Sequence, residues 1–304
     1  MAPFVFPDVL VLAGGGTVDH AWMTGVLAGV EDAAGVDFRR VEFFVGTSAG
    51  SIVAARLVSG RSPRRAAAPG DDAAERDGEV PAGRMERITR RAARLGWTAT
   101  APLAPLALGL GAPAGALARA ALLSRAPDAG RTHESLRRRV ASWEPRFDGR
   151  LRVCCVDKAS GKRFVFGAPG APKAQVADAV AASCAIPWVF APVWIGGREY
   201  VDGGVWSVTN LDVAPAGRES EVLCLDPTGA LARAGGRTGM LRRAFGVAAA
   251  LEIQLLRQQG ARVRHVIPDG GSAAAMGTRF MDDDAAPATL AAGYVQGLAI
   301  GREC

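Results

Sequence analysis

The five residues Gly46-Thr47-Ser48-Ala49-Gly50 constrain the fold of this chain more than any other stretch. They follow the apolar run 41–45 directly and precede the helix-prone segment 51–55. A strand that enters a helix through a Gly-x-Ser-x-Gly turn holds its serine in a strained conformation, with the hydroxyl beyond the end of the sheet. The pattern predicts a nucleophilic serine at position 48. A tight turn in which Ser48 only caps the helix would give the same pattern.

A second glycine-rich turn lies upstream of the serine. Residues 8–13 are a mostly apolar run of strand length that ends in Gly14-Gly15-Gly16, and residues 21–34 are typical of a helix. Glycines at a helix N-terminus expose backbone N–H groups that can face a negative charge. An oxyanion hole would use them in this way. A phosphate-binding loop is disfavoured by the glycine spacing, and a flexible turn is the remaining interpretation.

A third turn carries an acid. The segments 193–195 and 198–201 flank Gly196-Gly197, which predicts a hairpin, and the second arm runs into Asp202-Gly203-Gly204. A carboxylate at a strand end, followed by two glycines, is accessible to substrate and to another side chain. An aspartate that only caps a turn is the alternative.

Strands alternate with helices along the rest of the chain. We expect further strands at 151–157, 163–166, 221–226 and 262–267, and helices at 175–183, 239–259 and 285–300. The arginines at 137–139 indicate the solvated face of another helix. In 239–259 the predicted buried stripe is Leu241, Phe245, Ala248, Leu251 and Leu255. This alternation predicts an α/β fold, with a mostly parallel sheet covered on both faces and catalytic loops at the carboxyl ends of its strands.

The region 60–130 interrupts this pattern with a composition rich in Arg, Ala, Pro and Gly. Within it, residues 84–95 predict a basic amphipathic helix, and 97–123 carry almost no charge. Prolines and glycines exclude an ordinary membrane-spanning helix from 97–123. Two interpretations stay open: a lid or lipid-contacting surface, or an insertion whose apolar side packs on the domain. Otherwise we interpret residues 1–304 as one domain.

Composition limits the class of protein. With 49% hydrophobic residues in 304, the chain can bury a sizeable core. Its net charge of +6 favours anionic partners, whether membrane, nucleic acid or phosphorylated substrate. Because no basic motif is interleaved with aromatic residues, nucleic acid is the least favoured of these partners.

The five cysteines and three histidines predict no metal site, because none has the spacing of metal ligands. We expect the cysteines to be reduced and mostly buried. Residues 1–9 lack the pattern of a secretory signal, which agrees with unpaired thiols in the cytoplasm.

Together, Gly14-Gly15-Gly16, Gly46-Thr47-Ser48-Ala49-Gly50 and Asp202-Gly203-Gly204, the last preceded by Ser183-Cys184-Ala185-Ile186-Pro187, resemble the patatin-like phospholipase family. In that family a glycine-rich oxyanion loop, a Gly-x-Ser-x-Gly serine and an Asp-Gly-Gly/Ala aspartate occur in this order. The similarity runs from about residue 9 to 210, omits the insertion, and is greatest over 182–210. The resemblance implies a three-layer α/β/α fold and a cofactor-free Ser-Asp dyad that cleaves acyl esters of phospholipids, lysophospholipids or glycerides.

Carried over to this sequence, the resemblance makes Ser48 the nucleophile and Asp202 the base, while the amides of Gly14, Gly15 and Gly16 hold the oxyanion. A carboxylate buried beside an acyl pocket has a raised pKa, and general-base help of this kind contributes roughly a hundredfold to ten-thousandfold. The expected partners are a lipid or acyl-ester substrate and, through peripheral contact, an anionic membrane surface.

One residue departs from the family pattern. Thr17-Val18-Asp19-His20 follows the glycines, so Asp19 stands where the family has glycine. An ionised Asp19 about 6 Å from the oxyanion would cost roughly 2 to 3 kcal/mol at a dielectric of about 20, or about a hundredfold in rate. If its side chain turns outward, caps the helix and pairs with His20, it costs little.

Two other functions remain open at this point. One is an esterase with a Ser-His-Asp triad, in which His265 is the base and Asp226 orients it. The other is a catalytically weak or inactive protein of the same fold that binds lipid or membrane, with a disabled oxyanion loop.

Overall fold

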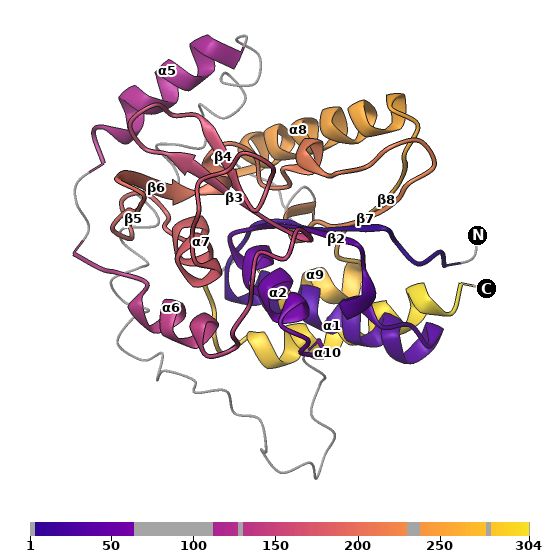
Figure 1. The fold of residues 1–304 in the computed structure, drawn as a ribbon. Helices are drawn as coiled ribbons and strands as arrows, with labels where there is room; N and C mark the ends of the chain where they lie inside the picture. Colours follow the sequence, from indigo (N-terminus) through magenta and orange to yellow (C-terminus); the bar gives the residue numbers. More distant parts are fainter. Residues whose placement is uncertain (1–3, 64–111, 127–129, 230–237, 278–280, 304) are drawn as a thin grey trace.

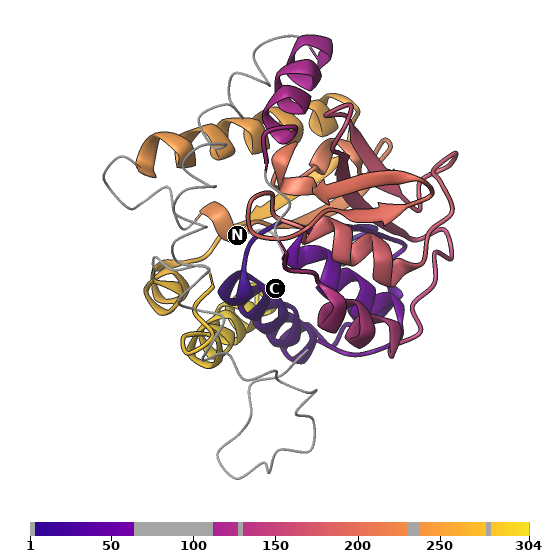
Figure 2. The same cartoon turned by 90° about the vertical axis from the view of Figure 1, so that its left-hand side faces the viewer.

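The computed structural model describes residues 4–63, 112–126, 130–229, 238–277 and 281–303. The amphipathic helix expected at 84–95 lies outside these residues, as does most of the insertion. The described residues form three layers, with a central sheet between two layers of helices (Figures 1 and 2). The α/β fold expected from the sequence is confirmed.

Eight strands form the sheet in the order β5-β6-β3-β2-β1-β7-β8, with β4 paired to β3. Their bounds are β1 Val9–Leu12, β2 Phe43–Thr47, β3 Leu151–Asp157, β4 Arg163–Phe166, β5 Val193–Ile195, β6 Arg198–Asp202, β7 Glu221–Leu225 and β8 Arg262–Val266. The run from β3 through β2, β1 and β7 to β8 is parallel, whereas β4, β5 and β6 pair antiparallel at one side. Asp202 therefore lies at the carboxyl end of its strand, as expected for a catalytic loop, but this strand is one of the antiparallel ones.

Helices cover both faces of the sheet. On one face lie α1 (Thr17–Ala34), α2 (Ala49–Val58), α9 (Gly270–Met276) and α10 (Ala286–Gly301), and on the other lies α8 (Thr238–Gln258) (Figure 1). The alternation of β1 shows the two cores: Leu10 and Leu12 belong to the cluster that includes Trp22 of α1, and Val9 and Val11 belong to the cluster that includes Ile253 of α8. The cluster of Leu10 also includes Val180 of α7 (Val176–Ser183) and Val140 of α6 (Glu134–Ala141), so these two helices lie on the same side as α1. The last residue of α5 (Ala112–Leu123) packs against β3 and β6.

The buried stripe expected along α8 is wrong at two of its positions, whereas Ala248 is buried as expected, and the side chains of Leu241 and Phe245 lie outside the described ones. Leu251 and Leu255 are 51% and 50% exposed, and the buried face carries Ile253 and Leu256 instead. Glu252 on that face accepts a hydrogen bond from the N–H of Leu211. This polar contact orients the helix in a way that a pattern of apolar residues cannot predict.

Two other expectations can be compared with the described residues. Leu123 at the end of α5 is fully buried and packs with Val156 and Val201, so this part of the insertion packs on the domain. Cys154, Cys155, Cys184 and Cys224 are free and buried, as expected. Across the described ranges, every helix is too short or too polar to cross a bilayer.

Candidate active site

Ser48 lies in a strained turn between β2 and α2. Its backbone has φ 47° and ψ −122°, an unusual conformation for a residue with a side chain. The close approach of β1 requires glycine at position 50, because a Cβ there would collide with the backbone oxygen of Leu12. Although Ser48 is the N-cap residue of α2, its hydroxyl makes no capping hydrogen bond. The interpretation of Ser48 as a simple helix cap is therefore wrong.

The strand register brings Asp202 to Ser48. Because β4 pairs with residues 153–156 of β3, the partners at 151–154 (β2) and 155–157 (β6) share the other edge of β3. Thr47 is opposite Cys154 and Asp202 is opposite Cys155. Hence β2 and β6 meet end to end on one edge, and the chain leaves β2 at Ser48 where β6 finishes at Asp202.

The segment after α7 contacts both residues. The Ser183 hydroxyl accepts a hydrogen bond from the N–H of Ser48 at 2.9 Å and donates one to the Cys154 carbonyl at 2.7 Å. Two residues on, the Ala185 carbonyl accepts from the N–H of Asp202 at 3.0 Å. The sequence analysis used the motif 183–187 only as part of the family resemblance and predicted no role for Ser183.

Burial changes the acidity of Asp202. The residue is only 5% exposed, and this desolvation raises the pKa of its carboxyl to about 7, although hydrogen bonds from the Gly204 N–H and from the Ser48 hydroxyl lower it. The Gly204 bond is 2.7 Å long. A carboxyl with this pKa can take up a proton and release it near neutral pH.

A buried thiol also lies beside the serine. Burial and the nearby Asp202 raise the pKa of Cys184, and the Ser48 hydroxyl is among its hydrogen-bonding neighbours. A neutral thiol is a weak nucleophile. Cys184 is therefore no rival to Ser48 at neutral pH.

The glycine loop, residues 14–16, departs from the expected oxyanion hole. The N–H of Gly14 donates to the Val208 carbonyl at 2.8 Å, and the N–H of Gly16 donates to Asp19 Oδ2 at 2.6 Å. Among the described residues, only the Gly15 N–H of these three has no acceptor. The assignment of Gly14 as an oxyanion donor is wrong, because its N–H already donates to the Val208 carbonyl. The N–H of Gly16 likewise donates to the Asp19 carboxyl in this structure.

Asp19 does not turn outward, so the second position expected from the sequence is wrong. Its side chain turns inward, is fully buried, and packs where a Cβ on Gly15 would be. Desolvation raises the pKa of its carboxyl to about 7, the Gly16 N–H lowers it, and the charge of Asp226 raises it. Asp19 does satisfy an N–H at the start of α1, but it does so from inside the protein.

The Ser-His-Asp alternative is wrong for this structure. His265 and Asp226 do contact each other, with Nε2 3.1 Å from Oδ2. His265 lies on β8, however, which is separated from β2 by β1 and β7. Three strand spacings amount to about 14 Å. This distance is too great for His265 to take a proton from Ser48.

A buried polar network supports the site from behind. Asn210 donates to the Thr47 hydroxyl at 3.0 Å, next to the serine, and to the Ser207 carbonyl at 2.5 Å. Arg163 donates to the Asn210 side chain and pairs with Asp212. No sequence pattern singled these residues out, because each is an ordinary polar residue until the loop after Asp202 folds over β2.

The sequence of the chain matches the model of a known protein family. The model described as patatin-like phospholipase matches residues 10–215, which is more than half of the chain and includes the glycine loop, Ser48 and Asp202. The chain belongs to the patatin-like phospholipase family.

Two solved structures similar to this patatin-like chain are from bacteria. VipD from Legionella pneumophila is 12% identical with a TM-score of 0.41, and the similarity covers 97% of this chain and 66% of VipD. The ExoU chain of the ExoU-SpcU complex from the type III secretion system of Pseudomonas aeruginosa is 22% identical with a TM-score of 0.39, covering 98% of this chain and 51% of the other. Because both TM-scores are below 0.5, the fold of this chain is assigned from its own strand order and not from these two structures. No curated protein matches the chain.

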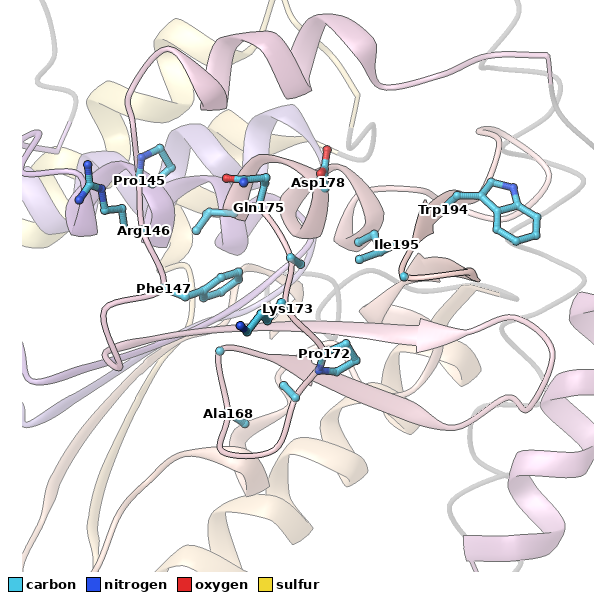
Figure 3. Close-up of a pocket in the computed structure, with 15 residues that line it drawn as sticks. Pro145, Arg146, Phe147, Ala168, Pro172, Lys173, Gln175, Asp178, Trp194 and Ile195 are labelled. Carbon is cyan, nitrogen blue, oxygen red and sulfur yellow. The ribbon is translucent and has the colours of Figure 1, made fainter.

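One cavity of this patatin-like chain lies away from Ser48. It has a volume of about 730 Å³ and is lined by Phe147, Lys173 and Gln175, among others (Figure 3). Gln175 precedes the first residue of α7, whereas Ser183, which contacts Ser48, is the last. The cavity and the serine are thus at opposite ends of α7, about 12 Å apart along its axis. Within the described ranges, no cluster of three or more His, Cys, Asp or Glu residues could hold a metal.

Proposed function

We propose that this chain is a serine hydrolase that cleaves carboxylic esters of lipids, with Ser48 as nucleophile and Asp202 as base. The observation that supports the proposal is the end-to-end meeting of β2 and β6, since Ser48 then follows one strand where the buried Asp202, with a pKa raised to about 7, ends the other.

The proposed reaction has two steps. Ser48 Oγ attacks the ester carbonyl while Asp202 takes the hydroxyl proton, and collapse of the tetrahedral intermediate expels the alcohol, which receives that proton. A water then attacks the acyl-enzyme and gives its proton to Asp202. When the carboxylic acid leaves, that proton returns to Ser48 Oγ. Free acid and free enzyme result, and no cofactor takes part.

The oxyanion needs at least two donors in this scheme. Gly15 offers its N–H, which has no acceptor among the described residues. The first N–H groups of a helix lack partners within it, so Ala49, the first residue of α2, offers a second donor. The nucleophile and one of its donors would then come from the same turn.

Lipid is the substrate class that the surroundings favour. Ala185, Val189 and Phe190 form an apolar cluster immediately after the Ser183 segment. The net charge of +6 favours contact with an anionic membrane surface. Phospholipids, lysophospholipids and glycerides all combine an ester with acyl chains, and the family match points to the same class.

Hydrolysis of a short-chain nitrophenyl ester and of a phospholipid in vesicles tests the proposal. We expect Ser48→Ala to remove hydrolysis almost completely, and Asp202→Asn to lower kcat by about a hundredfold to ten-thousandfold. Asp269→Asn and Ser142→Ala are matched controls, because they change an acid that caps α9 and an exposed hydroxyl, and neither residue is part of the site. Substantial activity in Ser48→Ala or Asp202→Asn, or its loss in the controls, would contradict the dyad.

A second candidate function has one observation in its favour. Asp19 occupies the Gly16 N–H, so a protein that binds lipid without cleaving it would also fit this loop. Vesicle binding that survives Ser48→Ala, together with no hydrolysis by the unaltered protein, would favour this function over the hydrolase.

A further inference from the structure

The peptide group between Gly15 and Gly16 has its carbonyl directed to the active site. Ser48 Oγ is 3.4 Å from the Gly15 carbonyl oxygen, while the N–H of the same peptide donates to Asp19 Oδ2 at 2.6 Å. No described peptide bond is cis. In a trans peptide the C=O and N–H point in opposite directions. The Gly16 N–H consequently faces away from Ser48.

This orientation is opposite to the one that an oxyanion requires. A carbonyl oxygen near the reacting atom repels developing negative charge, whereas an N–H stabilises it. Half a turn of the peptide would exchange the two groups. Such a turn rotates ψ of Gly15 and φ of Gly16, and neither residue has a Cβ to obstruct it.

We propose that Asp19 is a positioning residue that holds the Gly15–Gly16 peptide with its carbonyl toward Ser48, and that release of the Gly16 N–H from Asp19 turns this peptide and completes the oxyanion hole. This inference rests on the proposed hydrolysis by Ser48. Asp19 acts through the peptide and does not touch the substrate.

The burial of Asp19 explains why its hold on Gly16 is strong. The carboxyl is fully buried against Gly15, and among the described residues its Oδ1 has no partner. Its hydrogen bond to the Gly16 N–H is therefore its main compensation for lost water. Bonds to an ionised carboxylate are about twice as strong as those between neutral groups.

The charged groups around Asp19 predict how the hold depends on pH. Asp226, at the end of β7, faces Asp19 and is itself paired with His265 of β8. Burial and this neighbour raise the pKa of Asp19 to about 7. Above that pH the carboxylate is ionised and binds the Gly16 N–H most strongly, and below it the neutral acid accepts more weakly. The hold on the peptide therefore increases as the pH rises through about 7.

Two substitutions separate the hydrogen bond from the charge. Asp19→Ala removes both, whereas Asp19→Asn removes the charge but keeps an oxygen that can accept from Gly16. On a short-chain nitrophenyl ester at about pH 8, we expect kcat of Asp19→Ala to be about tenfold or more above the unaltered protein, with KM unchanged, since one oxyanion donor is worth roughly a hundredfold to a thousandfold. Asp19→Asn should gain less, and the advantage of Asp19→Ala should shrink below about pH 7.

Asp269→Ala is the control for loss of a helix cap. Asp269 caps α9 through the Ser272 N–H at 2.7 Å and is not part of the site, so kcat should stay unchanged. Equal kcat in Asp19→Asn and Asp19→Ala would assign the effect to charge alone. Unchanged kcat in both variants would show that Asp19 has no effect on catalysis. Either result overturns the proposal.

A second readout does not depend on turnover. In the NMR spectrum of the unaltered protein the Gly16 amide proton should be shifted downfield and should titrate near pH 7, and Asp19→Ala should abolish both properties. A Gly16 amide proton whose chemical shift does not change with pH near 7 would contradict the proposal that Asp19 positions this peptide. If it titrates but no variant hydrolyses ester, the proposed function fails while the positioning of the peptide by Asp19 stands.

Discussion

The serine turn (residues 46–50) and the glycine loop (residues 14–16) are built alike but oriented differently. Each joins one of two neighbouring parallel strands, β2 or β1, to a helix, and each is rich in glycine. In the serine turn, hydrogen bonds to Ser183 and Ser51 fix the backbone, so the Ser48 hydroxyl is not needed to cap the helix. In the glycine loop, Val208 and Asp19 occupy two of the three N–H groups.

The difference teaches what a glycine-rich turn does and does not predict. Glycine gives the backbone freedom to adopt either orientation. Which orientation it adopts depends on the acceptors that surround it. Asp19 lies three residues from Gly16, and Val208 is supplied by a loop almost two hundred residues downstream of Gly14.

The largest effect should come from disturbing the serine turn itself. Gly50→Ala places a Cβ against the backbone oxygen of Leu12, so β1 and α2 would have to move apart. We expect a loss of about 3 kcal/mol or more in the free energy of unfolding. Gly246→Ala in α8 is the control, since a Cβ there meets nothing within 4 Å and alanine favours a helix. Urea denaturation measures both, and a Gly50→Ala variant as stable as the control would contradict the close approach.

The pH dependence of the acylation rate tests the serine turn's partner, Asp202. Its pKa is raised to about 7, and only the deprotonated form can take the Ser48 proton. The rate should therefore be low in acid and increase to a plateau above about pH 7, by about a hundredfold between pH 5 and 8. Single-turnover kinetics in the Asp19→Ala background isolates this ionisation. A midpoint near 4, the usual value for an aspartate, would argue against a desolvated base.

A smaller effect should come from the residue that holds the serine turn. Ser183→Ala leaves the Ser48 N–H and the Cys154 carbonyl without their buried partner, which should cost about 1 to 3 kcal/mol of stability. Because the turn also loses its alignment, we expect kcat to fall about tenfold. Ser142→Ala, which removes an exposed hydroxyl bonded to the Arg139 carbonyl, is the matched control. Equal kcat and stability in the two variants would exclude a positioning role for Ser183.

The sequence predicted much of this architecture from local patterns. The strands at 151–157 and 163–166 agree with their predicted bounds, and most others agree within one or two residues. Gly46, Ser48 and Gly50 also predicted their own geometry, because a strained turn between a strand and a helix is a local property.

The details that decide chemistry were not local. That β2 and β6 share one edge of β3 depends on β4 occupying the other, and no residue near Asp202 encodes this. The inward position of Asp19 depends on how α1 packs, so charge and spacing alone could not choose between its two expected positions. Glu252 is a similar case, because an acid on a buried helix face can be recognised only once the Leu211 N–H is placed against it.

Labelling with a fluorophosphonate probe tests the central claim most directly, since the probe phosphonylates only a serine that is activated as a nucleophile. We predict one adduct, on the peptide that contains Ser48, with labelling slowed strongly in Asp202→Asn and accelerated in Asp19→Ala. An unlabelled Ser48 in both the unaltered protein and Asp19→Ala, or labelling unaffected by Asp202→Asn, would contradict the dyad.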